Sequence, residues 1–128
     1  MFIRQIIYSS IIFVLLDAVY LSTFSNFFNG VVKRVQGAGI TFNIWSGVLC
    51  YASLLIGLNY FILNDKRRTA LEAFLLGFII YSVYETTNYA ILKNWSPYAV
   101  IIDSVWGGIL FMLSTIITRF LLGARTKE

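Results

Sequence analysis

The 128-residue sequence contains no histidine, one cysteine and one proline, and only 12% of its residues are charged. Without histidine, a Ser-His-Asp catalytic arrangement and an imidazole metal site are excluded. The single cysteine, Cys50, has no partner within the chain, which excludes a disulfide-stabilised scaffold. The sequence also lacks a glycine-rich phosphate loop. Ordinary globular domains carry about a quarter charged residues, roughly twice the share found here, so the low charge argues against a water-soluble protein.

Apolar residues make up 59% of the chain and aromatic residues 17%, which is too much hydrophobic surface for a disordered protein. The net charge of +4 comes from basic residues that flank apolar runs. No basic stripe with interleaved exposed aromatics is present, so nucleic-acid binding is not expected. Cationic flanks around apolar runs are typical of membrane insertion. These features predict a multi-pass integral membrane protein whose main partner is the lipid bilayer.

Four stretches of the chain are long and apolar enough to cross a membrane, which takes about 20 residues in a helix. They are residues 3–26, 42–63, 70–92 and 97–122. Asp17 interrupts the first stretch and no small-residue cleavage pattern follows it, so we expect a retained helix rather than a signal peptide. The short polar connectors favour antiparallel neighbours. The expected fold is therefore a single all-α membrane domain over residues 1–128, an antiparallel four-helix bundle that could also form a homo-oligomer.

Local signals support these limits. Thr69 and Glu72 have the spacing of a capping box at the start of the third helix, and Ser96 followed by Pro97 is typical of the start of the fourth. Residues 27–36 place apolar side chains on one side and Lys33 and Arg34 on the other. Two interpretations stay open for this segment: a separate, lid-like interfacial helix, or a continuation of the first helix beyond the lipid.

The distribution of basic residues predicts the orientation. With four spans, the two termini and the second connector share one side of the membrane, and this side carries seven basic residues. The opposite side carries three, Lys33, Arg34 and Lys93. Both termini are therefore expected to be cytoplasmic.

Three of the six acidic residues, Asp17, Glu85 and Asp103, lie inside predicted spans, each on a different helix. Counted from the outward end of each span at ~1.5 Å per residue, their depths are about 9 to 14 Å. No basic residue lies at that level. A bare carboxylate in hydrocarbon is too costly, so these groups must be protonated, hydrated or paired, and clustering should keep at least one proton in place. Three acids at matched depth predict a functional site.

Neutral polar residues accompany the acids. Tyr81 and Asn88 share one face of the third helix with Glu85, Trp106 shares a face of the fourth with Asp103, and Tyr20 follows Asp17 by three residues. The outer half of the second span offers Ser46, Tyr51 and Asn43 as polar residues. Other polar and aromatic residues have simpler explanations. We expect an interfacial aromatic belt from Trp45, Tyr89, Trp95 and Tyr98, isolated packing roles for Ser53 and Asn59, and a small apolar packing role for Cys50.

Three motifs in the chain resemble those of a family of small four-helix predicted membrane proteins that is catalogued only as a domain of unknown function. The motifs are D-x-x-[W/Y]-L, Y-[D/E]-x-T-N and D-x-x-W-G. The matching residues here are Asp17, Tyr20 and Leu21; Tyr84, Glu85, Thr87 and Asn88; and Asp103, Trp106 and Gly107. The connector Lys93-Asn94-Trp95 is also similar. The resemblance covers nearly the whole chain, implies the same fold, groups the three acids, and adds Tyr84 and Thr87 to the expected site.

Two positions differ from the family pattern: Tyr20 stands where tryptophan is usual, and Glu85 where aspartate is usual. The longer arm of Glu85 moves its carboxyl by about one methylene, which disfavours a tight metal geometry. Carboxylates could bind a hard cation, but no ligand motif specifies a metal or a cofactor.

The leading functional hypothesis is an intramembrane acidic site that binds or conducts a proton, a cation or a small amine. Two alternatives stay open. One is a membrane-embedded enzyme that acts on a lipid or isoprenoid by carboxyl acid–base chemistry. The other is an accessory subunit whose acids receive a basic transmembrane helix of a partner.

Overall fold

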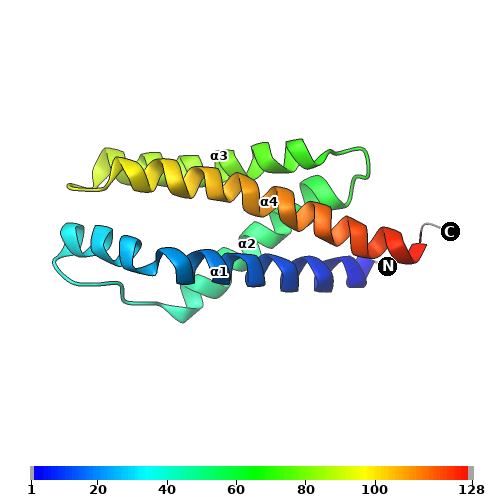
Figure 1. Cartoon of the computed structure of the whole chain (residues 1–128), viewed down its shortest axis with the longest axis horizontal. Helices are drawn as coiled ribbons and strands as arrows, with labels where there is room; N and C mark the ends of the chain where they lie inside the picture. Colours follow the sequence, from blue (N-terminus) through cyan, green and yellow to red (C-terminus); the bar gives the residue numbers. More distant parts are fainter. Residues whose placement is uncertain (1, 127–128) are drawn as a thin grey trace.

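The computed structural model describes residues 2–126, which form four long helices that run side by side (Figure 1). The helical elements are α1 (Phe2–Gln36), α2 (Ile44–Leu58) with the π-helix η1 (Asn59–Leu63), α3 (Ala70–Ile91) and α4 (Pro97–Thr126). All four are long and apolar enough to cross a membrane, with α2 and η1 together forming the second span. The chain is therefore an integral, multi-pass, all-α membrane protein, as predicted.

Helix α1 is longer than predicted, because it continues through residues 27–36 without a break. Its 35 residues extend over about 52 Å at ~1.5 Å per residue, well beyond a ~30 Å hydrocarbon core. The last turns are held by Val31, which is fully buried against Trp95 and Ala99. The separate interfacial helix is therefore wrong, and the continuation is what the structure shows. The helix ends at Gly37, whose φ of +78° favours glycine.

The tightest packing in the bundle is between α3 and α4, which meet at glycines. A Cβ added to Gly77 would lie 2.2 Å from the carbonyl oxygen of Gly107, and one added to Gly107 would lie 2.3 Å from Cγ of Tyr81. Small residues let membrane helices approach this closely. The capping box predicted for Thr69 and Glu72 is confirmed at the start of α3, and Ser96 accepts hydrogen bonds from the first backbone N–H groups of α4.

Helix α2 crosses the bundle obliquely and buries little of its first half (Figure 1). Trp45 is 77% exposed, and Cys50 also faces outward. The packing role expected for Cys50 is therefore wrong.

Arg119 of α4 was interpreted from the sequence only as a flanking charge, but it closes the end of the second span. Its guanidinium donates to the carbonyl oxygens of Ile62, at 2.9 Å, and of Asp65, at 3.1 Å. These carbonyls lie at the C-terminal end of η1, where free acceptors and the helix dipole favour a cation. In the connector that follows, hydrogen bonds from Arg67 lower the pKa of the exposed Asp65 carboxyl.

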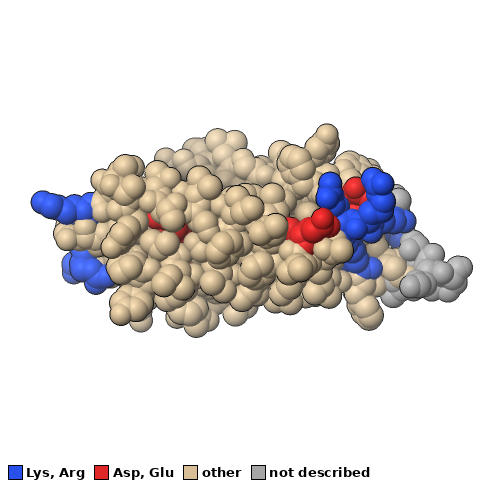
Figure 2. Space-filling view, turned by 90° about the horizontal axis from the view of Figure 1, so that it is seen from above, with Lys and Arg blue, Asp and Glu red and all other residues tan. Residues whose placement is uncertain are grey.

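The charged side chains gather mainly at the two ends of the molecule, and the band between them is largely uncharged apart from a small acidic patch (Figure 2). In the part of the chain that the structure describes, the ion pairs join Asp65 and Glu72 to Arg67 and Arg68 at one end. The acids inside the band have no basic partner among these pairs.

Candidate functional site

Asp17, near the middle of α1, is 7% exposed and accepts a hydrogen bond on each carboxylate oxygen. The indole Nε1–H of Trp106 on α4 donates to Oδ1 at 2.9 Å. The hydroxyl of Tyr51 on α2 donates to Oδ2 in a short hydrogen bond. Two neutral donors from two helices thus satisfy both oxygens of this buried carboxyl group.

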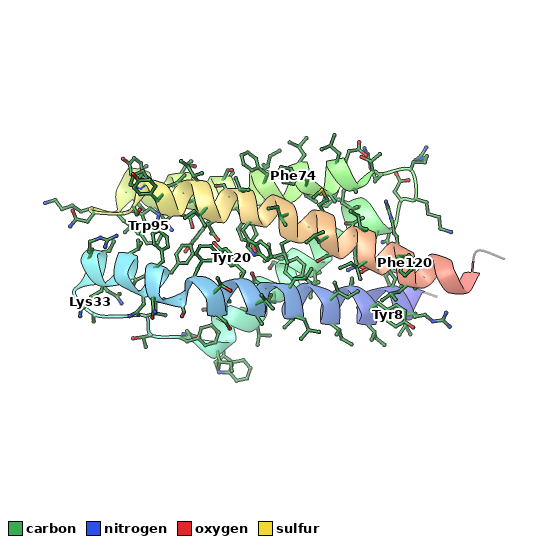
Figure 3. The ribbon with its side chains drawn as sticks, viewed as in Figure 1. Tyr8, Tyr20, Lys33, Phe74, Trp95 and Phe120 are labelled. Carbon is green, nitrogen blue, oxygen red and sulfur yellow. The ribbon has the colours of Figure 1, made fainter. Side chains whose placement is uncertain are left out.

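Asp103 on α4 lies one turn from Trp106 and accepts a hydrogen bond from Tyr20 of α1. The Tyr20 hydroxyl is 3.0 Å from Oδ1 of Asp103. The phenol ring stacks on the indole of Trp106, with a centroid separation of 4.7 Å and an interplanar angle of 5°. Tyr20 therefore links the surroundings of Asp17 to those of Asp103, and its side chain points into the space between α1 and α4 (Figure 3).

Glu85 on α3 is the most deeply buried of the acids, with 1% of its surface exposed. The indole Nε1–H of Trp95 donates to its Oε1 at 2.9 Å. The carboxyl groups of Glu85 on α3 and Asp103 on α4 lie within interaction range of each other. Two carboxyl groups this close together can share a hydrogen bond when one of them is protonated.

Trp95 lies in the connector between α3 and α4, and its side chain points back into the bundle (Figure 3). The preceding residue, Asn94, has a φ of 67°, which is uncommon for a side-chain-bearing residue but tolerated by asparagine. Helix α3 has already ended at Ile91, with Leu92 in an extended conformation, and the left-handed residue lies in the turn that leads to α4. From this turn the indole of Trp95 folds back toward Glu85. The aromatic-belt role expected for Trp95 is wrong, because the side chain is only 9% exposed.

Together these contacts form one continuous chain of side chains through all four helices, which we call the carboxyl chain. It consists of Tyr51, Asp17, Trp106, Tyr20, Asp103, Glu85 and Trp95. Four of the steps are hydrogen bonds, and the other two are the stacking of Tyr20 on Trp106 and the contact between the Glu85 and Asp103 carboxyls. The arrangement leaves each of the three acids with at least one neutral donor.

The structure does not bring all residues of the predicted site into the carboxyl chain. Tyr84 is 57% exposed, and the exposed Thr87 donates its hydroxyl to the carbonyl of Val83 at 2.6 Å. Both lie on the outer side of α3, which corrects the expectation that they belong to the site. Tyr81 and Asn88 are half-buried beside the carboxyl chain, and the ring of Tyr81 packs on Gly107.

Sequence reasoning left Trp95 out of the site and gave Tyr51 only a minor place. Trp95 was assigned to the membrane boundary because it lies in a connector, and helix periodicity cannot describe a side chain that folds back from a turn. The similarity of Lys93-Asn94-Trp95 to the family pattern was the available signal. Tyr51 lies in an almost wholly apolar span. Its hydroxyl reaches Asp17 only because of the angle at which α2 crosses the bundle, which the sequence does not contain.

The chemistry available here is that of carboxyl groups and neutral donors. No group of three His, Cys, Asp or Glu side chains within residues 2–126 is arranged to hold a metal ion. Both oxygens of Asp17 accept from donors, and Asp103 and Glu85 each accept from a neutral donor of their own. The arrangement suits a proton better than a larger cation, which would have to displace these donors.

Comparison with known proteins gives a family but no activity. No curated protein and no solved structure matches the chain. The family model described as predicted membrane protein DUF2177 matches residues 2–120, nearly the whole chain. The protein therefore belongs to the DUF2177 family of predicted membrane proteins.

Proposed function

We propose that the protein binds a proton at the Glu85–Asp103 pair and passes it along a path through the membrane. The observation that carries this proposal is the close approach of two carboxyls on adjacent helices, the buried Glu85 and the half-buried Asp103, away from any described ion pair. Such a pair is costly in a membrane unless its proton has a role, and intramembrane carboxyls are the usual groups of proton relays.

Asp17 supports a relay rather than a purely structural bond. Asp17 accepts hydrogen bonds from Tyr51 and from Trp106, whose ring stacks on Tyr20. With these two donors, Asp17 can carry a negative charge close to the Glu85–Asp103 pair. Like charges at this distance disfavour ionisation of all three acids at once. The hydroxyl of Tyr20 donates to Asp103 while its ring stacks on Trp106, the donor to Asp17, so Tyr20 lies between these two acids.

Proton binding can be tested by infrared spectroscopy of the purified protein in lipid. We expect a C=O band of a protonated carboxyl that shifts in D₂O and disappears in Glu85→Gln and in Asp103→Asn. The matched control is Glu72→Gln, because glutamine also completes a capping box at the surface of α3. Absence of this band from the wild-type protein would overturn the proposal.

Proton passage can be tested in vesicles that contain a pH-sensitive dye and a potassium diffusion potential. We expect wild-type protein and Glu72→Gln to acidify or alkalise the interior faster than protein-free vesicles do. Glu85→Gln and Asp103→Asn should fall to the protein-free rate. Equal rates for wild type and both site variants would contradict a relay.

A second candidate, an enzyme acting on a lipid or isoprenoid, is favoured by one observation. An apolar groove of about 360 Å³ lies between α1 and α4, lined by Tyr20, Phe24, Ile101, Ile102, Val105, Trp106 and Ile109. Two of these residues, Tyr20 and Trp106, donate hydrogen bonds to Asp103 and to Asp17, respectively. A lipid acyl chain or an isoprenoid in the groove would therefore be separated from the acids by a single layer of aromatic rings. Mass spectrometry of the lipids extracted from reconstituted vesicles tests this function. A product that forms with wild type but not with Glu85→Gln would establish it, and unchanged lipids would exclude it.

A further inference from the structure

A second polar cluster lies in the bundle at the end that carries the termini, and its hydrogen bonds among the described residues join uncharged side chains. Gln5 of α1 donates to Oδ1 of Asn59, at 3.0 Å, and of Asn64, at 2.8 Å. Asn59 donates in turn to Oγ of Ser9, at 3.1 Å. Gln5, Ser9 and Asn59 are all less than 10% exposed. Asn59 was expected to be an isolated packing residue, and this expectation is wrong.

Helix α4 adds two hydroxyls that are fully buried and have no hydrogen-bond partner among the residues described, those of Ser114 and Thr118. Thr115, between them, instead donates to the carbonyl of Phe111 at 2.8 Å, which is the usual arrangement in a membrane helix. A buried hydroxyl without a partner is energetically unfavourable, because it has lost its hydrogen bonds to water. Two such groups one turn apart on α4 therefore point to a polar ligand between the helices.

The register of α1 against α4 places these hydroxyls next to the amide cluster. Moving toward the N-terminus of α1, Tyr20 meets Asp103, Asp17 meets Trp106, and Phe13 meets Phe111. The next two turns of the same antiparallel pair place Ser9 opposite Ser114 and Gln5 opposite Thr118. The two helices converge toward this end of the molecule (Figure 1).

We infer that Gln5, Ser9, Asn59, Ser114 and Thr118 form a water-binding chamber inside the bundle. Amides and hydroxyls with spare hydrogen-bonding capacity are what a buried water needs, since it makes about three hydrogen bonds. The π-helical turn η1, which begins at Asn59, fits this role because such turns are frequent at functional sites.

The chamber also provides a route by which protons reach the carboxyl chain from the end of the bundle that carries the termini. This part of the inference rests on the proposed function. Between the chamber and the carboxyl chain lie Phe13 and Phe111, both fully buried, with ring centroids 5.5 Å apart. Phe13 also contacts Tyr51, the donor to Asp17, at a centroid separation of 6.2 Å. This aromatic layer separates chamber water from the acids and is the place where proton passage is controlled.

The water itself can be detected by NMR in nanodiscs with ¹³C-labelled threonine methyl groups. We expect a cross-peak between water and the Thr118 methyl, and none for Thr86, whose hydroxyl donates to the Ser82 carbonyl at the surface of α3. Ser114→Ala should weaken the Thr118 cross-peak without unfolding the protein. If Thr118 shows no water contact in the wild-type protein, the chamber is wrong even where proton flux is measured.

The functional link is tested separately by proton flux through Ser114→Ala/Thr118→Val, which removes both hydroxyls at nearly constant volume. A several-fold fall in flux, with the infrared band of the carboxyl pair retained, supports the chamber as the supply route to the acids. Unchanged flux overturns the link. A water cross-peak together with no wild-type flux would leave the chamber standing and contradict the proposed relay.

Discussion

The indole groups of Trp95 and Trp106 each donate one hydrogen bond to a buried carboxyl group. These hydrogen bonds offset part of the free-energy cost of placing a carboxyl group inside the membrane. In lipid, a carboxylate that loses a donor cannot replace it with bulk water. Each indole is therefore coupled to the ionisation of its acid as well as to packing.

Trp106→Phe should lower the free energy of unfolding by about 1–3 kcal/mol, because it leaves Oδ1 of Asp17 without a donor while retaining an aromatic ring against Tyr20. The measurement is detergent-induced unfolding in mixed micelles followed by circular dichroism. Trp45→Phe is the matched control, since Trp45 is 77% exposed, and it should leave the unfolding midpoint unchanged. Equal midpoints for the two variants would contradict the assigned role of Trp106.

The α3–α4 hairpin is the most closely packed element pair and carries Glu85 and Asp103 on facing sides. Its closeness depends on Gly77 and Gly107, where backbone and ring atoms occupy the space of a side chain. Separation of these helices would also separate the carboxyl pair, so packing and proton binding are linked here.

Gly77→Ala should destabilise the protein by about 1–3 kcal/mol, since its Cβ would meet a backbone carbonyl that cannot move aside. The infrared band of the carboxyl pair should shift in the same variant as the helices move apart. Gly57→Ala is the control, because nothing lies within 4 Å of its Cβ position, and its stability should change by less than about 0.5 kcal/mol. A tolerated Gly77→Ala with an unshifted band would show that the glycine contact does not position the acids.

The helices, their order and their capping follow from local sequence, because apolar length and caps are properties of neighbouring residues. Thr69, Glu72 and Ser96 show this directly. The three acids could be grouped from their positions along the spans. The donors could not all be found, because Trp95 reaches Glu85 through a left-handed turn at Asn94, and Asn59 gains its partners only from the crossing of α2 over α1. Such contacts depend on tertiary geometry that periodicity does not contain.

The whole molecule has two charged ends and a largely uncharged band, and the end with the termini carries more basic side chains (Figure 2). By the positive-inside tendency we expect this end to face the cytoplasm. The chamber of neutral polar groups would then open toward the cytoplasmic side, and the carboxyl pair would lie nearer the opposite face.

Orientation can be measured with single cysteines in a Cys50→Ser background and a membrane-impermeant maleimide. Lys93→Cys, in the connector before α4, should be labelled in intact cells. Lys66→Cys, in the connector before α3, should be labelled only after permeabilisation. Both positions are exposed, so a reversed labelling pattern would show that the termini face outward.

The two donors of Asp17 come from residues synthesised much later, Tyr51 after 34 further residues and Trp106 after 89. During translation, the first helix therefore enters the bilayer while its carboxyl has neither donor. It must cross as the neutral acid or remain beside the insertion machinery until the later helices arrive. Release into lipid and completion of the fold are thus coupled for this chain, and nascent chains that stop before α4 should be held back and degraded.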